Sequence, residues 1–348
     1  MSLHKAATRT ALISTQNGAL EPVSTIYNPY HVSKPTTKTN TITVPHGGYT
    51  TAVIYNLALT HFKHAHPNLY DTPASPISIQ LSFLRRTAAG PATFEVEDVK
   101  LGARTSIIHI KLLQPSEKKT GQLEAKVVGY ITVSPPSAEV GISAPTGWRA
   151  HPVPVPGSLP GGAVDLKKLA QTGRDGAWTK LETPFPEFRR ASCQLELYGP
   201  GKGETQQQRT GSMAIDQWAR FRPGGDENGR WTDAAVVYLL DMFPMALDGF
   251  DAVSATAVAK AEGAKVPEIK AKFWYPTVTL NIDMKKHLPA AGVEWLYSRI
   301  VTKVVRDGRT DLDVTVLDEK GEVVALSTQV GLVVSASRNL GTRKLQKL

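Results

Sequence analysis

The chain has 348 residues, enough for one large domain or two of ordinary size, and its hydrophobic content of 41% excludes a largely disordered protein. Its single cysteine, Cys193, excludes an internal disulfide and fits a reducing compartment. The net charge of +9 would suit nucleic acid, but no basic run is interleaved with aromatic residues, and one cysteine cannot build a zinc finger. The composition therefore indicates a globular protein with no nucleic-acid partner, and the charge fits an anionic small ligand.

Targeting signals are weak. No apolar run reaches the roughly 18 residues that span a membrane, and the first residues lack the apolar core of a secretory signal. We therefore expect a cytoplasmic protein that binds no membrane. The mitochondrion and the peroxisome are the alternative compartments. No acidic residue precedes Glu21, as in mitochondrial transit peptides, and the final Gln-Lys-Leu approximates a peroxisomal targeting signal.

The first half of the chain predicts one helix followed by four strands. Residues 1–40 are weakly patterned and predict an arm with at most one strand. The segment Pro45-His46-Gly47-Gly48 then opens a helix from Tyr49 to about His64. Alternation with period two follows in four runs, which predict strands. These runs are Ile77–Arg85, Thr93–Lys100, Arg104–Leu113 and Leu123–Val133.

A proline-rich stretch separates the two halves. Seven prolines lie from Pro135 to Pro160, and Gly161 and Gly162 follow. This composition favours an extended connector over helix or sheet. We predict an N-terminal unit with its arm over residues 1–134, a connector over 135–184 and a C-terminal unit over 185–348.

The second half repeats the order of helix and four strands after two opening strands. The helix runs from Thr232 to about Phe243, where Pro244 should end or kink it. A polar segment with helical character, Ala252–Ala264, comes next. The opening strands are Ala191–Tyr198 and Ser212–Arg222, and the later four are Phe273–Met284, Glu294–Arg306, Thr310–Leu317 and Val323–Ser335.

One acidic residue stands out in this second helix. Asp241 lies deep in a run that is apolar nearly all round, where an unpaired carboxylate is costly to bury. It therefore needs polar partners or a chemical role.

The two halves can be placed in register through short matches. On the helices Ala52-Val53-Ile54-Tyr55 matches Ala235-Val236-Val237-Tyr238, and in the strand series Ala88-Ala89-Gly90 matches Ala290-Ala291-Gly292 and Gly129 matches Gly331. In this register three polar residues of the second half fall opposite apolar ones of the first. The pairs are Asp241 with Ala58, Thr279 with Ile77, and Gln329 with Val127. Coordinated polar residues in one copy predict a site in the second half, and the alternative is a buried polar network that only fixes packing.

A long apolar helix followed by an antiparallel meander predicts a sheet wrapped around its own helix. Taken with this order, several short motifs give the chain a resemblance to the double hot-dog acyl-CoA thioesterases, in which two hot-dog units are fused in tandem. The resemblance implies an α+β fold and covers about residues 40–337. The motifs are His46-Gly47-Gly48, Leu81-Ser82-Phe83-Leu84-Arg85, Tyr238-Leu239-Leu240-Asp241-Met242, Thr279 through Pro289, Trp295, and Gly321 through Gly331.

The resemblance also implies a reaction and its residues. In families of this type an Asp on the second helix, a Thr or Ser on the next strand and a Gln on the last strand hold a water that attacks a thioester carbonyl. Residue by residue, these become Asp241, Thr279 and Gln329. His46, Gly47 and Gly48 are candidate substrate-binding residues, since the glycines let a backbone approach closely. The implied activity is hydrolysis of an acyl-CoA or carrier-linked acyl thioester, without a cofactor.

Some features keep other functions open. Leu240 stands where a small Ser is common, and the residues after Thr279 are less aromatic than usual. The alternatives are a hot-dog enzyme repurposed as a cyclase, isomerase or lyase, and a non-catalytic acyl binder. Sheet edges of hot-dog units often pair, so a homo-oligomer is compatible with the fold.

A group of histidines, His61, His64 and His66, lies at the end of the first helix. No cysteine or acidic ligand accompanies them in the sequence, so we predict a solvated helix end and no metal site.

Overall fold

The computed structural model describes residues 13–16, 19–26, 44–183, 186, 189–201, 214–242 and 273–335. The predicted helical segment Ala252–Ala264 lies outside these residues, as does the C-terminal tripeptide. Within the described part of the chain, no helix is both long and apolar enough to cross a membrane.

The first unit has the predicted order of one helix and four strands. Helix α2 (Gly47–Ala65) begins two residues earlier than predicted, because His46 caps it and accepts a hydrogen bond from the N–H of Gly48 at 3.1 Å. The four strands that follow are β3 (Ser75–Phe83), β4 (Gly90–Lys100), β5 (Ser106–Pro115) and β6 (Leu123–Ser134).

The second unit has the same order in its four longer strands, with three two-residue strands added. Helix α5 (Asp233–Leu239) is capped by Thr232, whose hydroxyl accepts a hydrogen bond from the N–H of Ala235. Two strands precede it, β9 (Leu195–Pro200) and β10 (Ala214–Phe221). The strands that follow are β11 (Phe273–Trp274), β12 (Thr277–Met284), β13 (Trp295–Val301), β14 (Val305–Arg306), β15 (Arg309–Leu317), β16 (Val323–Leu332) and β17 (Val334–Ser335).

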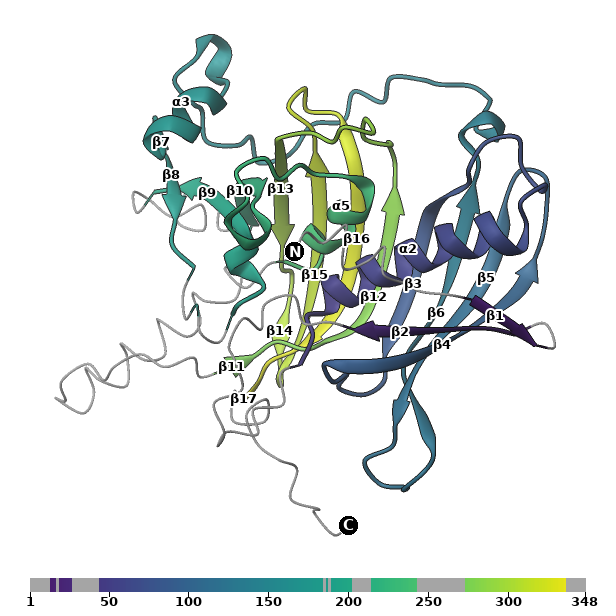
Figure 1. Cartoon of the computed structure of the whole chain (residues 1–348). Coiled ribbons are helices and arrows are strands. Elements are labelled where there is room, and N and C mark those ends of the chain that lie inside the picture. Colours follow the sequence, from purple (N-terminus) through teal and green to yellow (C-terminus); the bar gives the residue numbers. More distant parts are fainter. Residues whose placement is uncertain are drawn as a thin grey trace, which may run out of the picture.

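One continuous sheet joins the two units. Its order is β1 (Ile13–Gln16), β2 (Ala19–Ile26), β4, β5, β6, β3, β12, β16, β15, β13, β10, β9, β8 (Trp178–Leu181) and β7 (Arg174–Asp175). The antiparallel pair β3–β12 forms the seam between the units. The sheet curves, and both α2 and α5 lie on its concave side (Figure 1). Helix α2 packs against β3, and the two helices meet above the seam.

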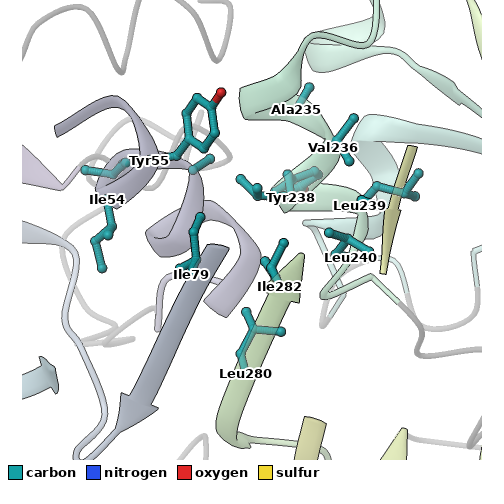
Figure 2. Packing of buried hydrophobic residues seen from close by; sticks show 14 of the residues in the cluster. Ile54, Tyr55, Ile79, Ala235, Val236, Tyr238, Leu239, Leu240, Leu280 and Ile282 are labelled. Atoms are coloured by element: carbon teal, nitrogen blue, oxygen red, sulfur yellow. The ribbon is translucent and has the colours of Figure 1, made fainter. Parts of the chain in front are cut away.

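The core fills the space between these helices and the sheet. Figure 2 shows Tyr238 of α5 beside α2, with Ile282 and Leu280 of β12 beneath it, and Ile54 on the far side of α2. Tyr238 is fully buried and its hydroxyl donates to the carbonyl of Ala191 at 2.7 Å. Burial of these side chains on both helices, at roughly 25 cal/mol per Å², ties the two units into one hydrophobic core.

The segments outside the repeat also join the sheet. The arm contains a hairpin, β1 (Ile13–Gln16) and β2 (Ala19–Ile26), rather than at most one strand, and β2 pairs with β4. Because β10 likewise pairs with β13 ahead of α5, each unit begins with two strands, then the helix.

The range assigned to the connector, 135–184, is not extended throughout. It contains the 3₁₀ turns Pro136–Ala138 and Pro160–Gly162, then α3 (Leu166–Thr172), β7 (Arg174–Asp175) and β8 (Trp178–Leu181). Strand β8 pairs with β9. Leu169 of α3 packs with Trp178 and Tyr198 in a second apolar cluster. The proline count is therefore a good guide only to residues before about 160.

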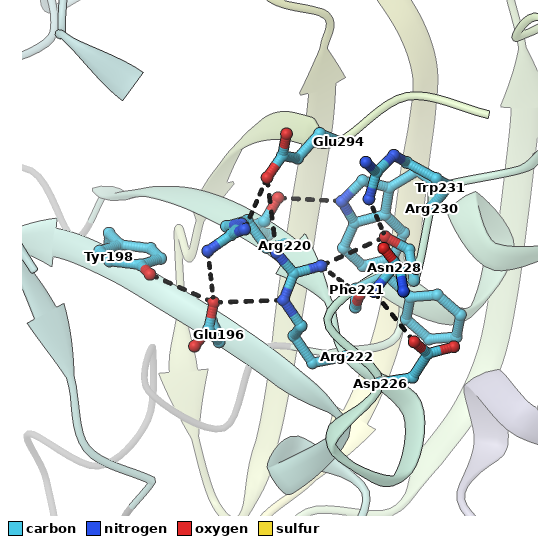
Figure 3. Close-up of polar contacts among 12 residues, drawn as sticks. Glu196, Tyr198, Arg220, Phe221, Arg222, Asp226, Asn228, Arg230, Trp231 and Glu294 are labelled. Atoms are coloured by element: carbon cyan, nitrogen blue, oxygen red, sulfur yellow. Dashed lines mark hydrogen bonds and ion pairs between the residues drawn. The ribbon is translucent and has the colours of Figure 1, made fainter. Parts of the chain in front are cut away.

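A network of two arginines and two glutamates fixes the edge of the second unit (Figure 3). Arg220 of β10 contacts Glu196 at 3.0 Å and Glu294 at 2.6 Å. Arg222 lies 3.5 Å from both glutamates and donates to the carbonyl of Gly229. Because Gly229 precedes α5 and Glu294 precedes β13, the network holds the entry of α5 against the sheet.

Candidate functional site

Asp241 lies directly after α5, at the point where this helix meets the first turn of α2. Its side chain is buried, with the residue only 5% exposed. Oδ1 accepts a hydrogen bond from the hydroxyl of Thr277 on β12 at 2.8 Å. Oδ2 lies 3.6 Å from Nδ1 of His46, and the nearby backbone N–H of Gly48 also stabilises the carboxylate. The isolated acid of the sequence therefore has partners from both units.

Burial dominates the electrostatics of this carboxylate. The loss of solvent raises the pKa of Asp241 above its ordinary value, while His46, Thr277 and the Gly48 N–H partly counteract the rise. Burial likewise lowers the pKa of His46. Since Nδ1 of His46 accepts from Gly48, the neutral imidazole carries its proton on Nε2. The site thus pairs a carboxylate of raised pKa with an uncharged histidine.

The two glycines of the predicted substrate-binding segment allow this close approach. A Cβ on Gly47 would lie 2.5 Å from Oδ2 of Asp241, and one on Gly48 would lie 2.6 Å from the carbonyl oxygen of Tyr238. The structure therefore places His46, Gly47 and Gly48 against the proposed base.

Gln329 fixes the chain beside Asp241. Its Nε2 donates to the carbonyl of Leu240 at 2.6 Å. A carbonyl only accepts, so the amide nitrogen must face it, and Oε1 points elsewhere. Oε1 is buried and has no hydrogen-bond partner among the described residues. Gln329 therefore both holds the end of α5 and offers an unused acceptor.

Thr277, and not Thr279, is the threonine bonded to Asp241. The β12–β16 pairing shifts between these two residues, and the resulting bulge turns Thr277 toward the helices. Beyond the bulge Thr279 alternates with Leu280, whose side chain is buried beneath the helices, so Thr279 lies on the opposite face. Sequence reasoning missed Thr277 because Thr277 and Thr279 are two residues apart. In a regular strand both hydroxyls would lie on the same face, so the sequence does not distinguish them.

Strand pairing also corrects the internal register. Both units have bulges at matching places, between Pro76 and Ser78 in the first and between Thr277 and Thr279 in the second. Thr277 therefore corresponds to Pro76, and Thr279 to Ser78 rather than Ile77. The predicted match of Thr279 to an apolar residue is wrong, because the offset read from the turns of the strand series does not hold along every strand.

After this correction, Gln329 is still a polar residue whose counterpart in the first unit is apolar. Gln329 pairs with Leu280 and Leu312, just as Ile131 pairs with Ile79 and Ile108. Its counterpart is thus Ile131 rather than Val127. By the same reasoning Ser298 of β13, buried and without a described partner, corresponds to the buried Phe94 of β4. The concave face of the second unit carries polar groups where the first is apolar.

Two helices over one continuous sheet, with a hairpin, helix and four strands in each half, define the double hot-dog class of protein. Models of the acyl-CoA thioesterase N-terminal and C-terminal domains match residues 36–134 and 164–333. The chain belongs to this acyl-CoA thioesterase family, and it is an enzyme of the hydrolase class.

Individual relatives agree with this assignment. A thioesterase-like protein, TwmA, from Talaromyces wortmannii is 30% identical over 320 residues, covering 86% of each chain. Among solved structures, a hot-dog protein of unknown function from Alicyclobacillus acidocaldarius is similar with a TM-score of 0.58 and 15% identity, over 94% of this chain and 98% of that one. An acyl-CoA thioesterase II from Mycobacterium marinum matches with a TM-score of 0.53 and 16% identity, over 97% and 100%. At this identity the two structures support the fold alone.

Proposed function

We propose that the enzyme hydrolyses an acyl thioester, with Asp241 as the general base. Water would attack the thioester carbonyl carbon while its proton passes to the carboxylate of Asp241, and the carbon–sulfur bond then breaks to release a thiol and an acid. The observation that carries this proposal is a buried carboxylate of raised pKa, held by groups from both units. A structural acid would gain nothing from such an environment.

The neighbouring groups suit the remaining tasks. The Thr277 hydroxyl fixes one carboxylate oxygen, and the free Oε1 of Gln329 can accept a hydrogen bond from the attacking water. The Gly48 N–H at the start of α2 donates to His46, but the remaining N–H groups of the first three helical positions have no carbonyl partner within the helix. Together with the positive end of the helix dipole they suit a developing oxyanion.

The substrate we propose is anionic, an acyl-CoA or a carrier-linked acyl group. The net charge of +9 supports this choice by long-range attraction. Purified enzyme incubated with a panel of acyl-CoA chains should release free thiol. Turnover of a metabolite without any thiol release would instead identify repurposed chemistry.

The pH dependence follows from the raised pKa of Asp241. A general base acts only when deprotonated, so kcat/KM should rise with pH through an apparent pKa above the ordinary value of an aspartate. A pH–rate profile measured below neutrality checks this. A profile flat down to the ordinary aspartate pKa would exclude Asp241 as the base.

The two threonines of β12 provide a matched pair. Thr277→Val removes the hydroxyl that fixes Asp241, and we expect kcat to fall about 10–100-fold. Thr279→Val, on the opposite face of the strand, should leave kcat within about twofold of wild type. Steady-state thiol release measures both. The reverse ranking would restore Thr279 to the role first predicted from the sequence.

A further inference from the structure

A second cluster of chemistry-bearing side chains lies at the other end of α2. His61 lies four residues before the last residue of α2, His66 is the C-cap of this helix, and Asp98 comes from β4. Nε2 of His61 lies 2.8 Å from Oδ1 of Asp98, and Nε2 of His66 lies 2.8 Å from Oδ2. One nitrogen from each ring and a carboxylate oxygen all lie within 4.8 Å of one another. The sequence showed the histidines but not the acid, which is 32 residues beyond His66.

We propose that His61, His66 and Asp98 bind a divalent transition-metal ion, with zinc as the best match. Two imidazoles and a carboxylate form a usual donor set for zinc, with metal–ligand distances of about 2.0–2.2 Å. Ligand atoms bound to one ion at those distances lie slightly farther from one another than the 2.8 Å that separates each histidine nitrogen from its Asp98 oxygen here. Small side-chain rotations are therefore sufficient to admit the ion.

The surroundings favour a cation. Among the described residues, the contacts of Asp98 are with these two histidines, and no lysine or arginine pairs with it. With neutral imidazoles the cluster carries one negative charge. It also adjoins the C-terminal end of a 19-residue helix, where unpaired carbonyl groups attract positive charge.

Each element prepares its ligand. His61 is 3% exposed, so packing holds its ring in place with Nε2 directed at the carboxylate of Asp98. The β4–β5 pairing shifts between Asp98 and Lys100, and such bulges redirect side chains near functional sites. The side chains of Asp98 and His66 are part-exposed, at 34% and 19%, which leaves the solvent side open to a water ligand.

The expected affinity is moderate. Metal binding moves the proton of His61 from Nε2 to Nδ1, which is buried and has no partner among the described residues. Missing outer-shell partners typically cost about 10–100-fold in metal affinity. We therefore expect micromolar binding rather than the tight binding of a structural zinc site.

This site is separate from the proposed thioester site. Helix α2 rises about 1.5 Å per residue, so its two ends are about 27 Å apart. The inference concerns binding alone and does not depend on the reaction at Asp241.

The test is zinc titration of the full chain, stripped with a chelator and freed of any affinity tag. Calorimetry should show one zinc ion per chain, and cobalt as a substitute should give the visible absorption of a tetrahedral site. His66→Gln and Asp98→Asn should each weaken zinc binding at least about tenfold. His64→Gln is the matched control, because His64 is an exposed histidine of the same helix end outside the cluster.

The outcomes separate cleanly. Retained affinity in His64→Gln, with loss in both cluster variants that still fold by circular dichroism, supports the site. The proposal fails if wild type shows no saturable zinc binding up to millimolar concentration. It also fails if His64→Gln loses as much affinity as His66→Gln, since the ion would then bind a generic histidine surface.

Discussion

Replacement of Asp241 by asparagine is expected to lower kcat about 10²–10⁴-fold, the usual contribution of a general base. Asparagine keeps the shape of the side chain and can still accept from the Thr277 hydroxyl. Its amide group cannot take a proton from water. The loss should therefore appear in kcat, with KM little changed, in steady-state thiol release.

The same substitution should not harm the fold. A group whose pKa is raised in the folded state binds its proton more tightly there, so its contribution to stability is lost as pH rises through that pKa. At neutral pH the ionised Asp241 is therefore a cost, and Asp241→Asn should raise the free energy of unfolding by roughly 0.5–2 kcal/mol. Urea denaturation at neutral pH measures this.

Asp233, at the start of the helix that Asp241 follows, supplies the control. Its carboxylate accepts from the N–H of Leu288 and contacts Nδ1 of His287, both at 2.8 Å, and it stands in the first turn of α5. Asp233→Asn should thus reduce stability by about 1 kcal/mol and preserve turnover. If both variants lose activity in proportion to stability, Asp241 is a structural residue and the mechanism is wrong.

The fold could be predicted from the sequence because the spacing of hydrophobic residues indicates most of its helices and strands. The alternation of the strand runs and the apolar helices located every element of the repeat to within a few residues, and the resemblance named the architecture. The arm hairpin escaped notice because residues 13–26 have little apolar alternation. Strand β8 escaped because nearby prolines dominated the composition.

The site was predicted in part, for a physical reason. Asp241 was marked by its cost in an apolar helix, a property of local sequence. Thr277 could not be chosen over Thr279, because a bulge changes which face a strand residue occupies without leaving a sequence signature. Asp98 could not be joined to His61 and His66 either, since that contact is made only when β4 pairs in the sheet.

The glycines at the start of α2 allow the closest test of geometry. Both occupy helical positions, where alanine would normally add about 1 kcal/mol to the free energy of unfolding. At Gly48 the added Cβ would meet the backbone carbonyl of Tyr238 at 2.6 Å. Backbone cannot rotate away, so Gly48→Ala should push the helices apart and lower the free energy of unfolding by about 1–3 kcal/mol.

Gly47→Ala should behave differently, because its Cβ would meet the carboxylate oxygen Oδ2 of Asp241 at 2.5 Å. A side chain can move aside, so stability should change little while kcat falls at least about tenfold through displacement of the base. The decisive measurement is the double variant. In an Asp241→Asn background the base is already lost, so Gly47→Ala should cause no further loss of kcat. An additive loss would show that Gly47 acts on substrate or fold independently of Asp241, and the proposed contact between the two units would then not be the centre of the reaction.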